Sequence, residues 1–190
     1  DEVQSGFGRT GKLFASEYWK ENGCAPDIIA TAKSIAGGVP LSAVIASKEV
    51  MDAVPGGTIG GTYGGNALAC AAGLEVLKLM DEGGLVKRSQ EIGKKVMAAF
   101  NEMKEKYEVV GDVRGLGAMI GVEFVKDKKT KEPNPEFVGK FIQECAKNGL
   151  LVENAGIYGN VIRFLAPLVI TDAQLDAGLE IYENAIKACM

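Results

Sequence analysis

The chain has 190 residues, enough for one domain or two small ones, and its 47% hydrophobic and 24% charged residues are ordinary for a globular protein. Its net charge is −4 with no block of basic residues, which argues against a nucleic-acid-binding surface, and its apolar runs are too short to cross a membrane. Because the chain has no histidine, it cannot provide a Ser-His-Asp triad or a histidine-ligated metal site.

The four cysteines are scattered along the chain without a C-x-x-C pair. This pattern favours reduced thiols in a cytoplasmic protein over a disulfide framework or a zinc site. The chain opens at Asp1 without an initiator methionine. We therefore expect a carboxyl-terminal fragment of a longer protein.

The first third alternates short apolar runs with glycine-rich connections. Residues 16–23 predict a short helix that ends at Gly23, and residues 26–34 predict a brief strand directly before Lys33. A strand and the start of a helix are expected over 41–50, and a loop over 56–66. A long helix then follows, with Asn66 at its N-cap position and its end near 83–84.

The remainder predicts a second set of elements. An amphipathic helix is expected over 85–107, with Ile92, Val96 and Phe100 on one stripe, and two strands over 108–125 around Gly115. A helix over 134–149, two short strands and a terminal helix that begins after Thr171 complete the chain. This alternation predicts an α/β fold with a boundary near residues 83–85, so we expect one domain over 1–84 and another over 85–190.

Two glycine motifs in the sequence resemble nucleotide-binding loops. The segment "GFGRTGKLF" (6–14) has the glycine and lysine spacing of a P-loop, but Leu13 stands where a magnesium-binding hydroxyl is needed. The segment "GLGAMIG" (115–121) leads into a β-rich run instead of a helix, unlike a dinucleotide-binding turn. Neither motif therefore predicts a nucleotide enzyme.

Several polar residues stand where chemistry could occur. Lys33 follows a predicted buried strand and precedes a small-residue loop, where an amine could attack a carbonyl, although a solvent-facing lysine is the simpler alternative. Asp1 stands at another predicted strand end, and Gln4 is close to it. Thr62, in "GGTYGG", precedes a helix and suits a phosphate, or is an ordinary turn residue. Arg163 is a charge within an apolar strand, so it needs a protein or substrate carboxylate as partner.

Taken in order along the chain, several segments resemble the class III (omega) aminotransferases, and among these the 4-aminobutyrate aminotransferases. The resemblance is carried by "DEVQSGFGRTGK", "AKSIAGGVPLSAVI", "GGTYGGNALACAAGLEVL", "DVRGLGAMIGVEF" and "GNVIRFLAPLVIT". Ala67 and Ala166 stand where the family pattern has prolines. The resemblance implies a pyridoxal phosphate-dependent transferase of fold type I, with residues 1–84 ending the large cofactor-binding domain and residues 85–190 forming the small carboxyl-terminal domain.

The same resemblance implies a role for each candidate residue. Lys33 would bind the cofactor covalently and later move a proton, and Asp1 would hold the pyridine nitrogen protonated. Gln4 would contact the phenolic oxygen of the ring. Thr62 would reach the cofactor phosphate of the neighbouring subunit in a homodimer with shared active sites. Arg163 would bind a substrate carboxylate.

The expected reaction is transfer of an amino group from an ω-amino acid, 4-aminobutyrate, to 2-oxoglutarate. Acetylornithine or ornithine aminotransferase and glutamate-semialdehyde aminomutase remain alternatives with the same cofactor. A non-catalytic module that binds phosphate ligands is a further alternative. Because the amino-terminal part of the family pattern is missing, we expect this chain alone to be inactive or nearly so.

Overall fold

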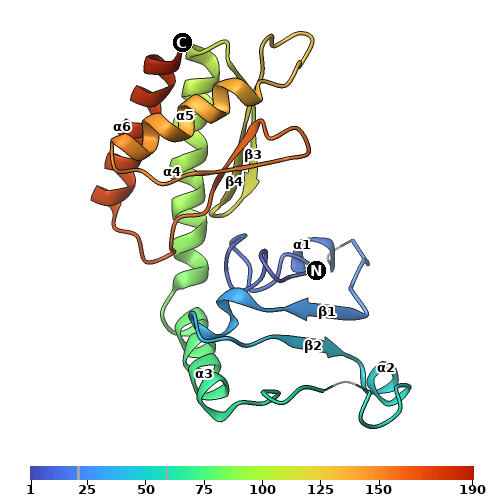
Figure 1. The fold of residues 1–190 in the computed structure, drawn as a ribbon. Helices are drawn as coiled ribbons and strands as arrows, with labels where there is room; N and C mark the ends of the chain where they lie inside the picture. Colours follow the sequence, from blue (N-terminus) through green and yellow to red (C-terminus); the bar gives the residue numbers. More distant parts are fainter. Residues whose placement is uncertain (21, 59) are drawn as a thin grey trace. The chain divides into compact units, whose positions relative to one another are not determined.

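The chain folds into two compact units, Asp1–Arg88 and Ser89–Met190 (Figure 1). The computed structural model describes residues 1–20, 22–58 and 60–190. Each unit is described by itself below. The helix α4 begins at Leu85 at the end of the first unit and continues into the second.

The first unit contains short elements joined by turns. In chain order they are α1 (Glu17–Lys20), β1 (Ile28–Thr31), the 3-10 helix η1 (Lys33–Ala36), β2 (Ala43–Ala46), α2 (Lys48–Asp52) and α3 (Ala67–Asp81).

β1 and β2 form an antiparallel pair in which Ile28 lies opposite Ala46 and Thr31 lies opposite Ala43. The strands and helices predicted over residues 16–84 are confirmed where the residues are described; residue 21 of the predicted helix 16–23 lies outside them. The cap of the long helix is confirmed too, since the Asn66 side chain accepts a hydrogen bond from the amide of Ala69 at 3.1 Å. Such a cap satisfies a backbone donor that the first turn of a helix leaves without a partner.

The second unit is a four-stranded antiparallel sheet with three helices. Its elements are α4 (Leu85–Lys106), β3 (Val110–Leu116), β4 (Met119–Phe124), α5 (Pro135–Lys147), β5 (Glu153–Ala155), β6 (Val161–Phe164) and α6 (Asp172–Cys189).

The strands of this sheet follow the order β3-β4-β6-β5. In Figure 1 the three helices lie on one side of the sheet. Burial along β4 alternates with a period of two, so that Ile120, Val122 and Phe124 face inward. The sheet therefore has one face that forms the core of the unit.

An aromatic cluster fills that core. The ring of Tyr182 on α6 lies 4.7 Å from the rings of both Phe100 and Phe141, measured between centroids. Phe124 on β4 lies 5.1 Å from Phe137 and 5.3 Å from Phe141 in the same way. Aromatic pairs at these separations stabilise a core beyond the area that they bury. The predicted apolar stripe of the first long helix is confirmed, because Ile92, Val96 and Phe100 are fully buried.

The β3–β4 hairpin turns at Gly117 and Ala118, two residues later than the sequence suggested. The expectation that the strands meet around Gly115 is wrong, because Gly115 lies within β3 opposite Ile120, and Gly117 takes the positive φ of 52° that the turn needs. This turn lies directly against α4. A Cβ atom on Gly93 would come within 2.2 Å of the carbonyl oxygen of Gly117.

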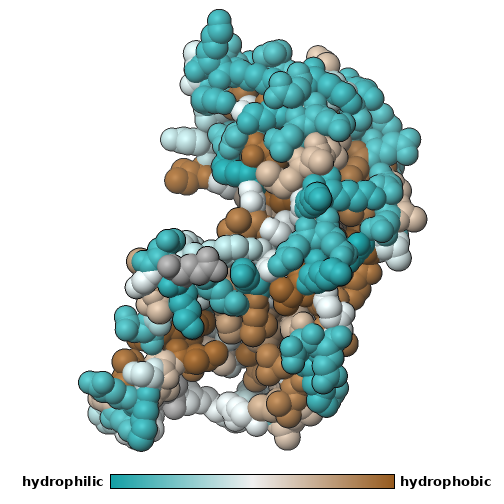
Figure 2. All heavy atoms as spheres, turned by 180° about the vertical axis from the view of Figure 1, so that it is seen from behind, coloured by the Kyte–Doolittle hydropathy of each residue, from teal (hydrophilic) through white to brown (hydrophobic). Residues whose placement is uncertain are grey.

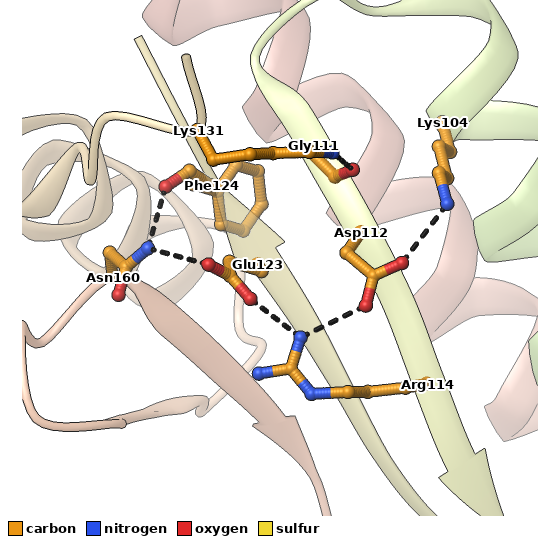
Figure 3. Close-up of polar contacts among 8 residues, drawn as sticks. All are labelled: Lys104, Gly111, Asp112, Arg114, Glu123, Phe124, Lys131 and Asn160. Carbon is orange, nitrogen blue, oxygen red and sulfur yellow. Dashed lines mark hydrogen bonds and ion pairs between the residues drawn. The ribbon is translucent and has the colours of Figure 1, made fainter. Parts of the chain in front are cut away.

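A polar network on the outer face of the sheet joins β3, β4 and α4 (Figure 3). Arg114 Nη1 donates to Asp112 Oδ2 at 3.0 Å and to Glu123 Oε2 at 2.6 Å. Lys104 Nζ on α4 binds Asp112 Oδ1 at 3.0 Å. Partial burial opposes ionisation of Asp112, but the hydrogen bonds from Lys104 and Arg114 outweigh it, so the pKa of Asp112 lies below its usual value.

The start of β6 is attached to β4 by Asn160, which is only 2% exposed. Its Nδ2 donates to the carbonyl oxygen of Phe124 at 3.0 Å (Figure 3). The backbone carbonyl of Asn160 accepts from the Phe124 amide at 2.8 Å. The terminal helix α6 begins with a full capping box between Thr171 and Gln174, as the sequence predicted for Thr171.

The surface of the first unit includes many apolar side chains. In the first unit, apolar side chains are exposed over β1, β2 and α3, and hydrophobic surface is visible in the lower half of Figure 2.

Across the described ranges, no helix is both long and apolar enough to cross a membrane. Nor do the described residues include a group of three or more cysteine or acidic side chains that could hold a metal ion.

Candidate functional site

Lys33 has an unusual backbone conformation. It is the first residue of η1, two positions after β1 ends, and its φ is +47°. A non-glycine residue in this left-handed region is strained and persists only where the surrounding structure holds it. Such strain is enriched at functional positions. Lys131, in an exposed turn of the second unit, has a similar φ of +58°, so the place of Lys33 directly after β1 counts as much as its backbone conformation.

The turn that carries Lys33 is supported by α3. Ala36, at the end of η1, is 1% exposed. Gly73 on α3 lies so close to this turn that a Cβ atom there would be 3.3 Å from the carbonyl oxygen of Ile35. The base of the lysine is therefore fixed by backbone packing, while its side chain is exposed.

Asp1 and Gln4 belong to a segment that is bound to β1. The amide of Glu2 donates to the carbonyl of Ala30 at 2.8 Å, and Ala30 lies three residues before Lys33. Asp1 Oδ1 accepts from the amide of Val3 at 2.9 Å, and the Asp1 side chain is exposed. Two of the predicted site residues, Asp1 and Lys33, are thus attached to the same strand of the first unit.

Residues 1–4 form no strand among themselves, and that Asp1 stands at a strand end stays a prediction. The backbone turns from Val3 onward, because the amide of Gly6 donates to the carbonyl of Glu2 at 3.1 Å. The P-loop-like segment that follows does not open into a helix. It forms a loop, and Phe7 and Phe14 pack edge to face at its base with centroids 5.8 Å apart.

Glu2 was not singled out in the sequence, yet it is the most buried acidic residue of this segment, with 4% exposure. Its carboxylate accepts hydrogen bonds from the amides of Ala15 and Ser16 at 3.1 and 2.7 Å and from Ser5 Oγ at 2.5 Å. Burial by itself raises the pKa of Glu2, but these hydrogen bonds outweigh it and hold the pKa below 4.5. Glu2 is therefore a buried carboxylate at neutral pH.

Thr62 lies in the exposed connection that leads to α3. The amide of Gly64 donates to the carbonyl of Gly61 at 2.9 Å, so the backbone at Thr62 is turned just before the capped start of the helix. A helix start of this kind favours an anion. Thr62 and Lys33 belong to the same unit but to different connections.

Arg163 lies on β6 in the second unit and has a protein carboxylate as partner. Its Nη2 binds Glu153 Oε2 on the neighbouring strand β5 at 2.6 Å, with 32% of the arginine and 77% of the glutamate side chain exposed. Both residues line a mainly apolar cavity of about 500 Å³ that extends to Tyr182 on α6. The sequence indicated that Arg163 needs an anion, but it did not indicate Glu153.

The chain is similar to known proteins over nearly its whole length. The family model "Aminotransferase class-III" matches residues 1–186. The 4-aminobutyrate aminotransferase GabT of Escherichia coli is 47% identical over 181 residues, which cover 95% of this chain and 42% of that protein. The 5-aminovalerate aminotransferase DavT of Pseudomonas putida is 48% identical over 184 residues, which cover 97% of this chain and 42% of that protein. The chain therefore spans less than half the length of these relatives.

Among solved structures, an amine transaminase from an uncultivated Pseudomonas species, determined in its PLP-bound form, superimposes with a TM-score of 0.87 and 33% identity. The match covers 100% of this chain and 44% of that one. The fold of the chain is thus that of a part of these transaminases, and the predicted α/β fold type I class is confirmed.

Proposed function

This chain belongs to the class-III aminotransferases, and from that premise we propose that the protein that carries it transfers an amino group from 4-aminobutyrate to 2-oxoglutarate with pyridoxal 5'-phosphate. The observation that carries the proposal is the strained Lys33 at the end of β1, with Asp1 attached to the same strand. The relative GabT supports 4-aminobutyrate as the donor. Residues 1–84 would end the cofactor-binding domain, and residues 85–190 would form the small domain.

The residues present suit this cofactor. The exposed amine of Lys33 suits the aldehyde of the cofactor, and the carboxylate of Asp1 suits its ring nitrogen. The amide of Gln4 suits the phenolic oxygen, and the hydroxyl of Thr62 suits the phosphate. When bound, the cofactor supplies an electron sink for the carbon that loses a proton. Only one oxygen of Asp1 is used by the Val3 amide, so the other is available for a ring nitrogen.

Each residue then has a defined task. Lys33 Nζ would hold the cofactor and later move the proton at the substrate carbon, while Asp1 would keep the ring nitrogen protonated. Gln4 donates its amide to the phenolic oxygen. Thr62 binds a phosphate in the neighbouring subunit, which requires a homodimer with shared sites. Arg163 exchanges Glu153 for a substrate carboxylate, because a guanidinium can bind either anion through the same nitrogen.

A second donor deserves the same assay. DavT is about as similar to this chain as GabT, and its name gives 5-aminovalerate, which is one methylene longer than 4-aminobutyrate. One methylene changes discrimination by only about ten- to two-hundredfold. Both donors should therefore be compared, with ornithine as a third.

The test is covalent attachment to Lys33. The full-length protein that carries this chain is mixed with pyridoxal 5'-phosphate, reduced with borohydride, and mapped by mass spectrometry. Lys33→Ala is the test variant, and Lys48→Ala is the control. Lys48 is also an exposed lysine and is ion-paired with Asp52 on α2. Label on Lys33 that is lost only in Lys33→Ala supports the proposal. Equal labelling of many lysines would instead favour the phosphate-binding module, for which Lys33 is dispensable. Cell fractionation would test the proposed cytoplasmic location.

A further inference from the structure

The buried carboxylate of Glu2 has no task in the proposed reaction, although it lies between two residues that do. Three parts of Glu2 are held by different segments. Its amide is bound to Ala30 on β1, its carbonyl accepts from Gly6, and its carboxylate accepts from the far end of the loop. A residue held at its amide, its carbonyl and its side chain cannot rotate without breaking several hydrogen bonds.

The loop that closes over Glu2 is the P-loop-like segment, together with the residues on either side of it. It reverses direction at Phe7, Gly8 and Gly11, whose φ values are +54°, +82° and +85°. Gly6 must lack a side chain, because a Cβ atom there would be 2.8 Å from the carbonyl oxygen of Glu2. The loop therefore returns Ser16 to the Glu2 carboxylate, which lies fourteen residues earlier in the chain.

We propose that Glu2 is a positioning residue for the cofactor: its carboxylate closes the loop 5–16 and so fixes the backbone from which Asp1 and Gln4 reach the ring. This inference rests on the proposed function for the roles of Asp1 and Gln4. The closure itself follows from the hydrogen bonds of Glu2 alone. The P-loop-like glycines serve this closure.

A neighbouring glutamate provides a matched control. Glu17 Oε1 accepts from the amide of Phe14 at 2.9 Å, so Glu17 also holds this loop, but it is not adjacent to Asp1 or Gln4. Glu2→Gln removes the charge at the position next to Asp1, and Glu17→Gln removes a charge elsewhere on the same loop. Ser5→Ala is a milder third variant, because it removes only one donor to Glu2.

The first measurement is hydrogen exchange at single-residue resolution on the 190-residue chain. Glu2→Gln should speed exchange of the Ala15 and Ser16 amides, which donate to the Glu2 carboxylate, by about ten- to hundredfold, the factor expected when a hydrogen bond to a charged group is lost. Ser5→Ala should give a smaller change at the same amides, and Glu17→Gln should affect chiefly Phe14. If Glu2→Gln does not fold, the Ser5→Ala variant decides, and unchanged exchange at Ala15 and Ser16 in that variant overturns the closure.

The second measurement is the visible absorption band and the dissociation constant of pyridoxal 5'-phosphate in the protein that carries this chain at full length. Glu2→Gln should shift the band and weaken binding by about tenfold or more, while Glu17→Gln leaves both as in the wild type. Equal effects of the two variants would show that general loosening of the loop is responsible and would overturn the positioning role. A wild-type protein that does not bind the cofactor at Lys33 would refute the proposed function and, with it, the role towards the ring.

Discussion

The close approach of α4 to the β3–β4 turn can be tested with one methyl group. In a solvent-exposed helix interior, replacing glycine with alanine is favourable by about 0.5–1 kcal/mol, because glycine loses more backbone freedom on folding. At Gly93 the added Cβ atom would lie 2.2 Å from the carbonyl oxygen and 2.5 Å from the carbonyl carbon of Gly117. These are backbone atoms of a tight turn, so they cannot move aside as a flexible side chain can.

The expected magnitude follows from these two opposing effects. Overpacking in a filled interior costs about 1–3 kcal/mol, and contact with backbone places Gly93→Ala at the upper end. After the gain in helix propensity of about 1 kcal/mol, a net loss of about 2 kcal/mol remains. For a urea m-value of about 2 kcal/mol per molar, this loss lowers the midpoint of unfolding by about 1 M.

Gly139 on α5 is the matched control, since a Cβ atom there would meet no atom within 4 Å. Gly139→Ala should therefore raise stability by about 0.5–1 kcal/mol, the opposite sign from Gly93→Ala. Urea unfolding followed by circular dichroism measures both variants. If Gly93→Ala proves as stable as Gly139→Ala, the helix and the turn are not packed backbone to backbone, and the reasoning is wrong.

Four further outcomes are expected. Asn160→Ala should destabilise the protein by about 0.5–1.5 kcal/mol in urea unfolding, because it removes one hydrogen bond from the Phe124 carbonyl, which keeps the Asn134 amide as a donor. Thr171→Ala should cost about 0.5–2 kcal/mol in the same assay through loss of the α6 cap. Burial, and then the hydrogen bond to the Glu183 carboxylate, raise the pKa of Tyr107 from 10 to about 12. The stability that this phenol contributes is therefore complete below pH 10 and is lost as the pH rises from 10 to 12. Tyr107→Phe should make that decline shallower in a pH series of unfolding curves, while the part due to Cys145 and Tyr182, whose pKa values burial also raises, remains. Limited proteolysis should cut near residues 83–85 and leave a resistant carboxyl-terminal fragment, because the apolar core lies in the second unit.

Local signals in the sequence predicted the elements of this fold well. Asn66 and Thr171 begin helices because their side chains satisfy backbone donors within three residues, and such interactions are visible in the sequence. The stripe of Ile92, Val96 and Phe100 follows a helical period for the same local reason. The family was also identified from the sequence, and the match of the family model to residues 1–186 confirms it.

The features that were missed depend on contacts between distant residues. Glu2 stands in the polar stretch "DEVQS", which gives no sign of burial, and its partners at Ala15 and Ser16 are brought near only by the loop. Glu153 meets Arg163 because β5 and β6 pair in one particular register. The position of the hairpin turn was missed because both Gly115 and Gly117 could form a turn, and only the pairing of Gly115 with Ile120 and the positive φ of Gly117 decide between them.

The first unit has little apolar core with which to hold its candidate site. Its buried apolar side chains among the residues described are Phe7, Ala15, Ala36 and Ala69. Three of these are alanines, and burying an alanine methyl group releases far less free energy than burying a leucine or phenylalanine side chain. The geometry around Asp1 and Lys33 must therefore depend on directional interactions, namely the hydrogen bonds of Glu2 and the backbone contact between α3 and η1. Loss of one such hydrogen bond should shift the positions of Asp1 and Lys33, and it should not change the free energy of unfolding of the second unit. For this reason, variants at Glu2 should alter cofactor binding while leaving the stability of Ser89–Met190 unchanged.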